Sequence, residues 1–405
     1  MKLHKNLALG IISGLEAILA ENLNANDVVR RLLKSNSSWG SRDRKTVAKI
    51  LYDIIRWKRL YLGVVDLEGK NNTNSHWGLI SCWMVLNDHQ LPDWEVFSKF
   101  KADGFKEKHD ALIKIRKYKQ AIPDWLDEKG VETFGEAFWE KEINTLNEPA
   151  KLVVRVNRLK TTPEKLKYSL QEKYGFNTKG VPTLPDALEF ESHQSLINTV
   201  EYREGHFEIQ DGNSQMIAPW LQPKAGELYF DCCAGAGGKS LHLANLTHDK
   251  AQIIAFDIFS SKLVELKRRA DRNGIKSIKT YFVNEENKID KYNAKGNGVL
   301  IDAPCSGLGV LKRNPDAKWL MNPNRMKEIQ IQQKQILQNY SKLVMPGGKL
   351  VYATCSVFPE ENRMQVDDFL NSESGKDFTL ASDKTYFSQE SGYDGFYAAL
   401  MVKKM

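Results

Sequence analysis

Residues 228–240 read LYFDCCAGAGGKS, and this stretch decides the fold. A short apolar run ends in an acidic residue, three glycines follow within four positions, and a lysine and a serine come next. This order is typical of a buried strand, a tight turn and the start of a helix. Backbone N–H groups at such a helix start can hold a nucleotide-like ligand. The stretch therefore predicts the first strand–turn–helix unit of an α/β domain with a cofactor site.

The chain that follows repeats this unit. Apolar runs of strand length alternate with helical segments, and we expect strands at 253–256, 278–283, 299–301 and 350–353, with helices at 260–273 and 326–344. Gly274 is expected to end the first of these helices, and residues 346–348 (Pro-Gly-Gly) the second. Repeated strand–helix–strand order predicts a parallel sheet covered on both faces. We therefore expect a Rossmann-like, doubly wound α/β domain over residues 206–405.

Two cysteines end apolar runs of this domain. Cys305 ends VLIDAPC and Cys355 ends LVYATC. Because ligands of a doubly wound sheet bind at the carboxyl ends of its strands, both thiols should lie beside the glycine turn. Either cysteine alone would be read as a small buried hydrophobic residue. Two of them at strand ends beside a cofactor turn favour covalent chemistry instead.

Three polar residues complete the predicted crevice. Pro304 fixes the backbone where the strand ends, which should direct Asp302 into the crevice together with Cys305. A carboxylic acid there can stabilise the charge that develops when a thiolate adds to an electron-poor ring. Lys239 should hydrogen-bond Asp302 or the substrate. Asp257, at the end of the next strand, is expected to bind ribose hydroxyls. The turn lacks strict G-x-G-x-x-G spacing, which disfavours NAD as the cofactor.

The rest of the chain divides into two predicted regions. Residues 1–120 should form an all-α domain, with apolar positions of a helix from Ser41 recurring at three- and four-residue steps. Residues 121–205 should form a small α+β RNA-binding subdomain, in which a strand at 152–157 precedes a helix opened by Thr162. The turn cysteines Cys232 and Cys233 are expected to be structural.

Composition limits the function classes. The 405 residues carry a net charge of +7, which modestly favours a polyanionic partner. Five cysteines without C-x-x-C spacing argue against a disulfide framework and a zinc site, so we expect reduced thiols and no metal. No convincing membrane span or signal peptide is found, and we expect a cytoplasmic monomer. Lys312 and Arg313, directly after the Cys305 loop, are placed to hold substrate phosphates.

Several motifs together resemble those of the Sun-type (RsmB-like) RNA cytosine-5 methyltransferases. The resemblance rests on DAPCSG at 302–307, YATCS at 352–356 with PEEN at 359–362, and CAGAGGKS at 233–240. It runs in the same order from about residue 153 to residue 405, and includes Arg155-Val156-Asn157 and RNPDAKW at 313–319. Over residues 1–120 it implies a NusB-like RNA-binding domain.

This resemblance implies a role for each site residue. Cys355 would be the nucleophile, Cys305 would assist product release, Asp302 would contact the target cytosine, and Lys239 would support that site. The family's usual adenine-contacting Asp is replaced here, so Asn284 or Glu285 would substitute. S-adenosylmethionine would be held by Cys233, Ala234, Gly235, Ala236, Gly237, Gly238, Lys239, Asp257, Asn284, Glu285 and Asp302. RNA would be held by Arg155, Asn157, Lys312 and Arg313.

The resemblance implies methyl transfer to carbon 5 of a cytosine in RNA through a covalent cysteine–cytosine intermediate. We expect ribosomal RNA as the substrate, with transfer RNA as the alternative. A non-catalytic RNA-binding assembly factor is a further alternative, but such a factor would be expected to have lost a cysteine or the glycine turn. A DNA cytosine methyltransferase would use the cysteine of a Pro-Cys motif, and would leave Cys355 unexplained.

Overall fold

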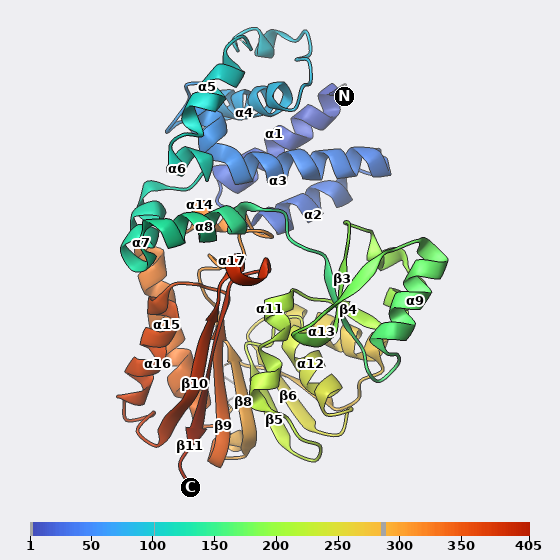
Figure 1. Ribbon diagram of the computed structural model, residues 1–405, viewed down its shortest axis with the longest axis vertical. Helices are drawn as coiled ribbons and strands as arrows, with labels where there is room; N and C mark the ends of the chain where they lie inside the picture. The colour runs from blue at the N-terminus through green and yellow to red at the C-terminus, as the bar shows by residue number, and fades with distance from the viewer. Residues whose placement is uncertain (1–2, 101, 285–288) are drawn as a thin grey trace. The chain divides into compact units, whose positions relative to one another are not determined.

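The computed structural model describes residues 3–100, 102–284 and 289–405 (Figure 1). The chain divides into two compact units. The helical unit contains the residues up to 148 together with 310–323, and the α/β unit contains 149–309 and 324–405. Among the described residues, no helix combines the length and the apolar character that crossing a membrane requires.

The helical unit packs amphipathic helices around one apolar core. Its helices are α1 (Lys5–Leu19), α2 (Ala25–Ser35), α3 (Ser41–Val64), α4 (Thr73–Leu86), α5 (Phe105–Leu112), α6 (Arg116–Lys119), α7 (Asp124–Phe134), α8 (Glu136–Asn147) and α14 (Ala317–Leu320). The apolar stripe predicted on α3, from Val47 to Ile55, is buried in this core, which confirms the helix expected from Ser41. Helical structure continues past residue 120 through α7 and α8.

The helical unit is completed by residues 310–323, which lie far along the chain from the rest of it. The Asp316 carboxylate accepts a hydrogen bond from the Ala25 backbone N–H at the start of α2 (2.9 Å). The Trp319 indole N–H donates to the Ile55 carbonyl of α3 (2.7 Å). This segment is therefore bonded into the helical unit by specific polar contacts.

The α/β unit begins with a small antiparallel sheet in the order β2-β3-β1-β4. Its strands are β1 (Val153–Val156), β2 (Thr178–Val181), β3 (Leu184–Phe190) and β4 (Phe207–Ile209), with α9 (Pro163–Tyr174) and α10 (Val200–Arg203). Leu166 and Leu170 of α9 pack on its apolar side. Thr162 caps α9 by accepting a hydrogen bond from the Lys165 N–H (3.3 Å), which confirms the helix start predicted there.

A seven-stranded sheet follows, in the order β10-β11-β9-β8-β5-β6-β7. Its strands are β5 (Leu228–Cys232), β6 (Gln252–Asp257), β7 (Ile278–Phe282), β8 (Gly296–Asp302), β9 (Val344–Thr354), β10 (Phe378–Tyr386) and β11 (Phe396–Lys403). Its helices are α11 (Gly212–Gln215), α12 (Gly238–Leu246), α13 (Ser260–Asn273), α15 (Pro323–Ser341), α16 (Arg363–Leu370) and α17 (Ser388–Ser391). Strands β5 to β9 pair in parallel, whereas β11 is antiparallel to β9 and β10.

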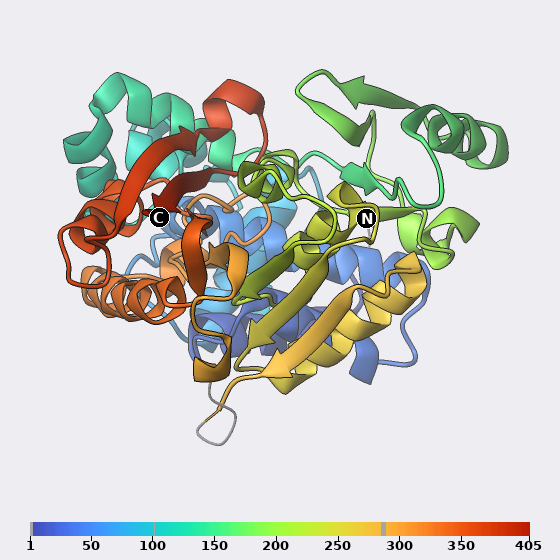
Figure 2. The same ribbon diagram turned by 90° about the horizontal axis from the view of Figure 1, so that it is seen from below.

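Helices cover both faces of this sheet (Figure 2). Alternate residues of a strand point to opposite faces. On β6, Ala255 packs with the α13 residues Leu263 and Leu266, whereas Phe256 joins the cluster that contains Leu337 of α15 and Val366 of α16. The mixed α/β architecture with a dominant parallel sheet confirms the predicted fold class.

Two features of the large sheet differ from the sequence-based expectations. The helix expected at 326–344 begins earlier and ends at Ser341, because Leu343 and Val344 are buried and Val344 already begins β9. The Pro-Gly-Gly sequence lies inside β9, where the pairing with β8 shifts register, instead of ending the helix. The antiparallel hairpin of β10 and β11 had no corresponding sequence prediction.

The order of the strands positions the functional residues. The chain proceeds from β5 outward to β6 and β7, and then crosses to β8 on the other side of β5. Ligands of open α/β sheets bind at such a reversal of strand order, beyond the carboxyl ends of the strands. Strands β5, β8 and β9 are neighbours and end at Cys232, Asp302 and Thr354.

Candidate active site

The two predicted cysteines meet beyond adjacent strands. Cys305 follows β8 and Cys355 follows β9, and the parallel register pairs Asp302 with Ala353. The two Sγ atoms are 3.1 Å apart, and the Cys355 backbone N–H donates to the Cys305 Sγ at 3.3 Å. Both are free thiols with partly exposed side chains.

The two thiols have different surroundings. The hydrogen bond to Cys355 and burial raise the pKa of Cys305 well above its ordinary value, and the charges of Cys355 and Glu361 act in the same direction. Cys305 therefore tends to keep its proton and to donate it in the hydrogen bond between the thiols. Since the thiolate is the reactive form of a cysteine, this arrangement favours Cys355 as the nucleophile.

Lys239 and Asp302 form an ion pair beside the thiols. The Lys239 Nζ lies 2.5 Å from the Asp302 Oδ2, so the contact predicted for Lys239 is present. Burial alone would lower the pKa of Lys239, but Asp302, and to a smaller extent Cys355, hold that pKa above its ordinary value. The Phe396 ring lies 5.3 Å from the same ammonium group. A permanent positive charge therefore lies among the groups that would take up negative charge during a reaction.

Two glycines of the turn have positive φ but different surroundings. Gly237 has φ 85°, and a Cβ there would lie 2.4 Å from Leu266. Gly235 has φ 55°, but a Cβ there would meet nothing within 4 Å. Packing of the turn against α13 thus requires a glycine at 237, whereas the space beside Gly235 is open. That opening leaves room for a ligand against the backbone.

A cavity of about 480 Å³ lies beside this turn. Asp257 lines it with a nearly buried carboxylate, which accepts hydrogen bonds from the Gly235 N–H (2.7 Å) and the Phe259 N–H (2.8 Å). Ile258 and Phe259 are more than half exposed although they are apolar. The lining residues are Cys233, Asp257, Ile258, Phe259, Asp302, Pro304, Gln332, Ile336 and Tyr340.

These surroundings fit the nucleoside part of S-adenosylmethionine. A fixed carboxylate can accept hydrogen bonds from two ribose hydroxyls, and apolar walls can cover an adenine ring. Burial raises the pKa of Cys233, which makes this thiol unreactive and agrees with a structural role. Asn284 follows β7 as an exposed residue and does not line the cavity, and Glu285 lies outside the described residues.

Arg155 and Asn157 lie in the interior of the α/β unit, with 3% and 2% exposure. The Arg155 guanidinium donates to the Gln210 side chain and to the Gly238 carbonyl of the glycine turn (3.0 Å). The Asn157 amide donates to the Gly205 and Asn273 carbonyls (2.8 and 2.9 Å). Both side chains were expected to contact RNA, but the structure places them where they bind protein backbone and join the small sheet to the large one.

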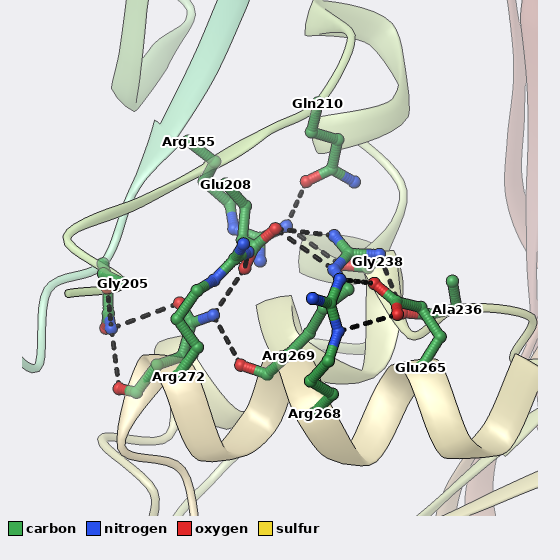
Figure 3. Close-up of polar contacts among 12 residues, drawn as sticks. Arg155, Gly205, Glu208, Gln210, Ala236, Gly238, Glu265, Arg268, Arg269 and Arg272 are labelled. Carbon is green, nitrogen blue, oxygen red and sulfur yellow. Dashed lines mark hydrogen bonds and ion pairs between the residues drawn. The ribbon is translucent and has the colours of Figure 1, made fainter. Parts of the chain in front are cut away.

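Glu208 organises the same junction (Figure 3). Its buried carboxylate accepts hydrogen bonds from Arg269 and Arg272 of α13. Burial alone would raise the pKa of Glu208, but the two arginines hold it below its ordinary value. Arg269 also donates to the Ala236 carbonyl (2.7 Å). The predicted cofactor turn is thus supported from behind by a buried ionic network.

Lys312 and Arg313 belong to the helical unit. Lys312 is 4% exposed, and its ammonium donates to the Thr145 carbonyl (2.5 Å) and lies 3.7 Å from Glu148. The Arg313 side chain is partly exposed. Lys312, which was expected to hold a substrate phosphate, is therefore bound to protein groups in the interior of its unit.

Sequence reasoning missed several residues of this site. Asp231 at the end of β5 is fully buried, and burial raises its pKa to about 7. Glu361 is also fully buried and accepts hydrogen bonds from the turns that carry both cysteines. No sequence motif predicted that α15 forms a wall of the cavity. Asp231 and Glu361 belong to the motifs described above, but the sequence analysis assigned them no role. Among the described residues, no cluster of metal-binding side chains occurs.

Comparisons with known proteins identify the family of this chain. The family model described as "16S rRNA methyltransferase RsmB/F" matches residues 218–402, and a model for the ferredoxin-like domain of the same family matches residues 122–196. The ribosomal RNA small subunit methyltransferase B of Pasteurella multocida is 31% identical over 74% of this chain and 69% of its own length. Among the relatives that carry this name, the matched part of this chain spans between 56% and 72% of the relative's own length.

Solved structures share the architecture. The crystal structure of PH0851 has a TM-score of 0.81 and 25% identity, with 100% of both chains covered. A methyltransferase homologue from Pyrococcus horikoshii has a TM-score of 0.63 and 25% identity, over 72% of this chain and 99% of that one. By its match to these sequences, the chain belongs to the RsmB/F family of S-adenosylmethionine-dependent 16S rRNA methyltransferases.

Proposed function

We propose that this chain methylates carbon 5 of a cytosine in ribosomal RNA, through a covalent bond between Cys355 and carbon 6 of the base. The observation that carries the proposal is the pair of thiols 3.1 Å apart beside the Lys239–Asp302 ion pair. The reaction needs one nucleophile, one group that helps to remove the product, and a charged pair that takes up developing charge. The four side chains supply these groups within one crevice.

The first step activates the base. Carbon 5 of cytosine is a poor nucleophile, and addition of the Cys355 thiolate to carbon 6 moves the electrons of the ring double bond towards carbon 5. The Lys239 ammonium stabilises the resulting charge, and its ion pair with Asp302 keeps that carboxylate in place near ring nitrogen 3. When bound, S-adenosylmethionine supplies an electrophilic methyl group, which carbon 5 accepts.

The second step restores the ring. Cys305 removes the proton from carbon 5, the ring double bond re-forms, and the bond between carbon 6 and the Cys355 sulfur breaks. The raised pKa of Cys305 depends first on its hydrogen bond to Cys355, then on burial, and then on the Cys355 charge. Once Cys355 is a neutral thioether, its charge no longer opposes ionisation of Cys305, so Cys305 loses its proton more readily. The second thiol thus becomes a base after the first has reacted.

The RNA must offer an unstacked cytosine. A base within a duplex cannot reach a crevice between strand ends, so a loop or single-stranded region is favoured. The names of the relatives support small-subunit ribosomal RNA as the substrate. The helical unit belongs, in this proposal, to RNA binding, since it lies outside the catalytic unit and the whole chain carries +7 net charge.

Bisulfite sequencing of total RNA tests the proposal. RNA from cells with the gene should keep one or more cytosines unconverted that become converted when the gene is deleted. Restoring the gene should restore protection, whereas a gene carrying Cys355→Ala should not. A modified position in transfer RNA would replace the proposed substrate, and an unchanged conversion pattern across all RNA would refute the proposed activity.

A further inference from the structure

The proposed chemistry leaves the acid beside the two cysteine turns, Glu361, without a role. Glu361 ends the short 3₁₀ helix Pro359–Glu361, is 0% exposed, and has no cationic partner within ion-pair distance among the described residues. A buried carboxylate is costly unless hydrogen-bond donors compensate for the water it has lost. The hydrogen-bond donors around Glu361 therefore indicate which parts of the structure stabilise its buried carboxylate.

The donors come from the turns that carry the two cysteines. The Glu361 Oε1 accepts from the Ser306 backbone N–H at 2.7 Å, and Oε2 accepts from the Ser306 hydroxyl at 2.6 Å. The same Oε2 accepts from the Ser356 hydroxyl at 2.5 Å. Ser306 and Ser356 each directly follow a cysteine. One carboxylate thus bonds to both Cys-Ser turns.

Further contacts fix the carboxylate itself. Gln333 of α15 donates to the Glu361 Oε1 (3.3 Å) and to the Pro304 carbonyl just before Cys305 (3.0 Å). The Tyr352 hydroxyl of β9 donates to the Glu361 carbonyl (2.8 Å). Strand β9, the helix α15 and both cysteine turns therefore meet at this residue. Its side chain has little freedom to move without moving a thiol.

The charge of Glu361 also acts on the thiols. The titratable groups that influence Cys305 are Cys355, Glu361 and Tyr352, and of these Cys355 has the largest effect. Tyr352 is itself buried, and burial raises the pKa of its hydroxyl far above the ordinary value, so it stays neutral. A negative charge at Glu361 opposes a second negative charge at Cys305.

We propose that Glu361 is a positioning residue with two effects: it aligns the two cysteine turns so that their thiols face each other, and its charge adds to that of Cys355 in keeping Cys305 protonated before Cys355 reacts. The alignment is inferred from the hydrogen bonds that Ser306 and Ser356 donate to Glu361. The charge effect is inferred because none of the described residues places a neutralising cation beside the Glu361 carboxylate. The inference builds on the function proposed above for the two cysteines. The charge effect is tested by a reaction of the free protein that needs neither RNA nor cofactor, and the alignment is tested by methylation.

Three substitutions separate alignment from charge. Glu361→Gln keeps the reach of the side chain but removes its charge, and the serine hydroxyls can rotate to accept from the new amide. Glu361→Asp keeps the charge but is one methylene too short to reach both turns. Glu361→Ala removes both properties. Glu373→Gln, at an 89% exposed carboxylate near the end of α16, serves as the matched control.

Alkylation by iodoacetamide is measured separately for each thiol by mass spectrometry between pH 6 and pH 10. In the unaltered protein, Cys355 should react first. In Glu361→Gln, the pKa of Cys305 should fall because a neighbouring negative charge is removed, so this thiol should react faster at pH 8 than in the unaltered protein. Glu361→Asp should leave the Cys305 profile closer to that of the unaltered protein. An unchanged Cys305 profile in Glu361→Gln would overturn the charge effect.

Methylation kinetics test the alignment. Glu361→Ala and Glu361→Asp should lower kcat by about 10²-fold, the usual effect of moving a reacting group by roughly an ångström, with little change in KM. Glu361→Gln should keep more activity than either. Equal changes of kcat and KM in step with lost thermal stability would overturn the alignment role.

A second set of variants covers a failure of the Glu361 substitutions to fold. Ser306→Ala and Ser356→Ala each remove one hydroxyl and leave the acid. Their effects on kcat should be non-additive, because both act through one carboxylate. Additive effects would contradict the inference. Failure of the proposed function looks different, since the unaltered protein would then methylate no RNA while the alkylation profiles could still shift.

Discussion

Replacement of Asp231 by asparagine is expected to change the pH dependence of stability in a direction that the structure specifies. Asp231 is 0% exposed, its Oδ2 accepts a hydrogen bond from the Ser240 hydroxyl, and its Oδ1 has no hydrogen-bond partner among the described residues. Burial raises its pKa from 3.8 to about 7, and the hydrogen bond from Ser240 only partly opposes this. Folding therefore favours the protonated acid.

The magnitude follows from the two pKa values. Below pH 3.8 the acid is protonated in both the folded and the unfolded chain, so its ionisation costs no stability. Between pH 3.8 and about 7 the unfolded chain loses its proton while the folded one keeps it, and stability falls by about 1.4 kcal/mol per pH unit. The loss amounts to about 2 kcal/mol at pH 5 and about 4 kcal/mol at pH 8.

Asp231→Asn has no carboxyl group to ionise, so it should escape this loss. The free energy of unfolding of the variant minus that of the unaltered protein should rise by about 2–3 kcal/mol from pH 5 to pH 8. Any constant cost of the new amide is the same at both pH values and cancels in this comparison. For a unit of this size the gain corresponds to roughly 5–10 °C in melting temperature. Urea or thermal unfolding of both proteins at the two pH values measures it, with Asp271→Asn on the exposed side of α13 as the control. The same stability difference at both pH values would refute the reasoning.

Further predictions concern the catalytic groups and the cofactor turn. Cys355→Ala should neither methylate RNA nor form an adduct, whereas Cys305→Ala should methylate once and remain attached to the RNA in a band that survives denaturation. The reverse pattern would exchange the two roles. Asp257→Ala should weaken S-adenosylmethionine binding by roughly 1–3 kcal/mol in calorimetry, and unchanged affinity would remove this residue from the site. Gly237→Ala should lower the melting temperature because a Cβ would meet Leu266 at 2.4 Å, and an unaltered melting curve would contradict the packing argument. RNA binding by the whole chain should fall steeply with salt in fluorescence anisotropy, and salt-independent binding would exclude a phosphate-contacting surface.

The sequence predicts those elements of the fold whose local residue pattern agrees with their final position in the structure. Strands β5, β6 and β8 contain short apolar runs that end in an acidic residue, and β7 and β9 alternate with helical segments, so the existence and parallel order of these strands could be inferred from the sequence. The boundary after α15 could not, because Leu343 and Val344 suit either a helix end or a strand start, and burial in the sheet decides between them. The hairpin β10–β11 is defined by pairing with β9, which is a non-local property.

The candidate site shows the same division. Cys305, Cys355, Asp302 and Lys239 stand at strand or helix ends, and sheet topology alone brings them together. Charged residues were less predictable, since a basic residue in a sequence can face either solvent or a buried acid. Arg155 and Lys312 are drawn inward by the carbonyls they bind, and only the three-dimensional arrangement reveals those acceptors.

The position of residues 310–323 in the chain determines when the helical unit can finish folding during synthesis. The helical unit lacks these residues until synthesis has passed the 161 residues from 149 to 309, which are the whole first part of the α/β unit. At a typical rate of about 5–20 residues per second, the earlier helices wait roughly 8–30 s for their last segment. During that interval the backbone N–H of Ala25 and the carbonyl of Ile55 remain without Asp316 and Trp319. The unit encoded first therefore reaches its final form late, and a nascent chain that stalls before residue 310 carries an unfinished surface for chaperones to recognise.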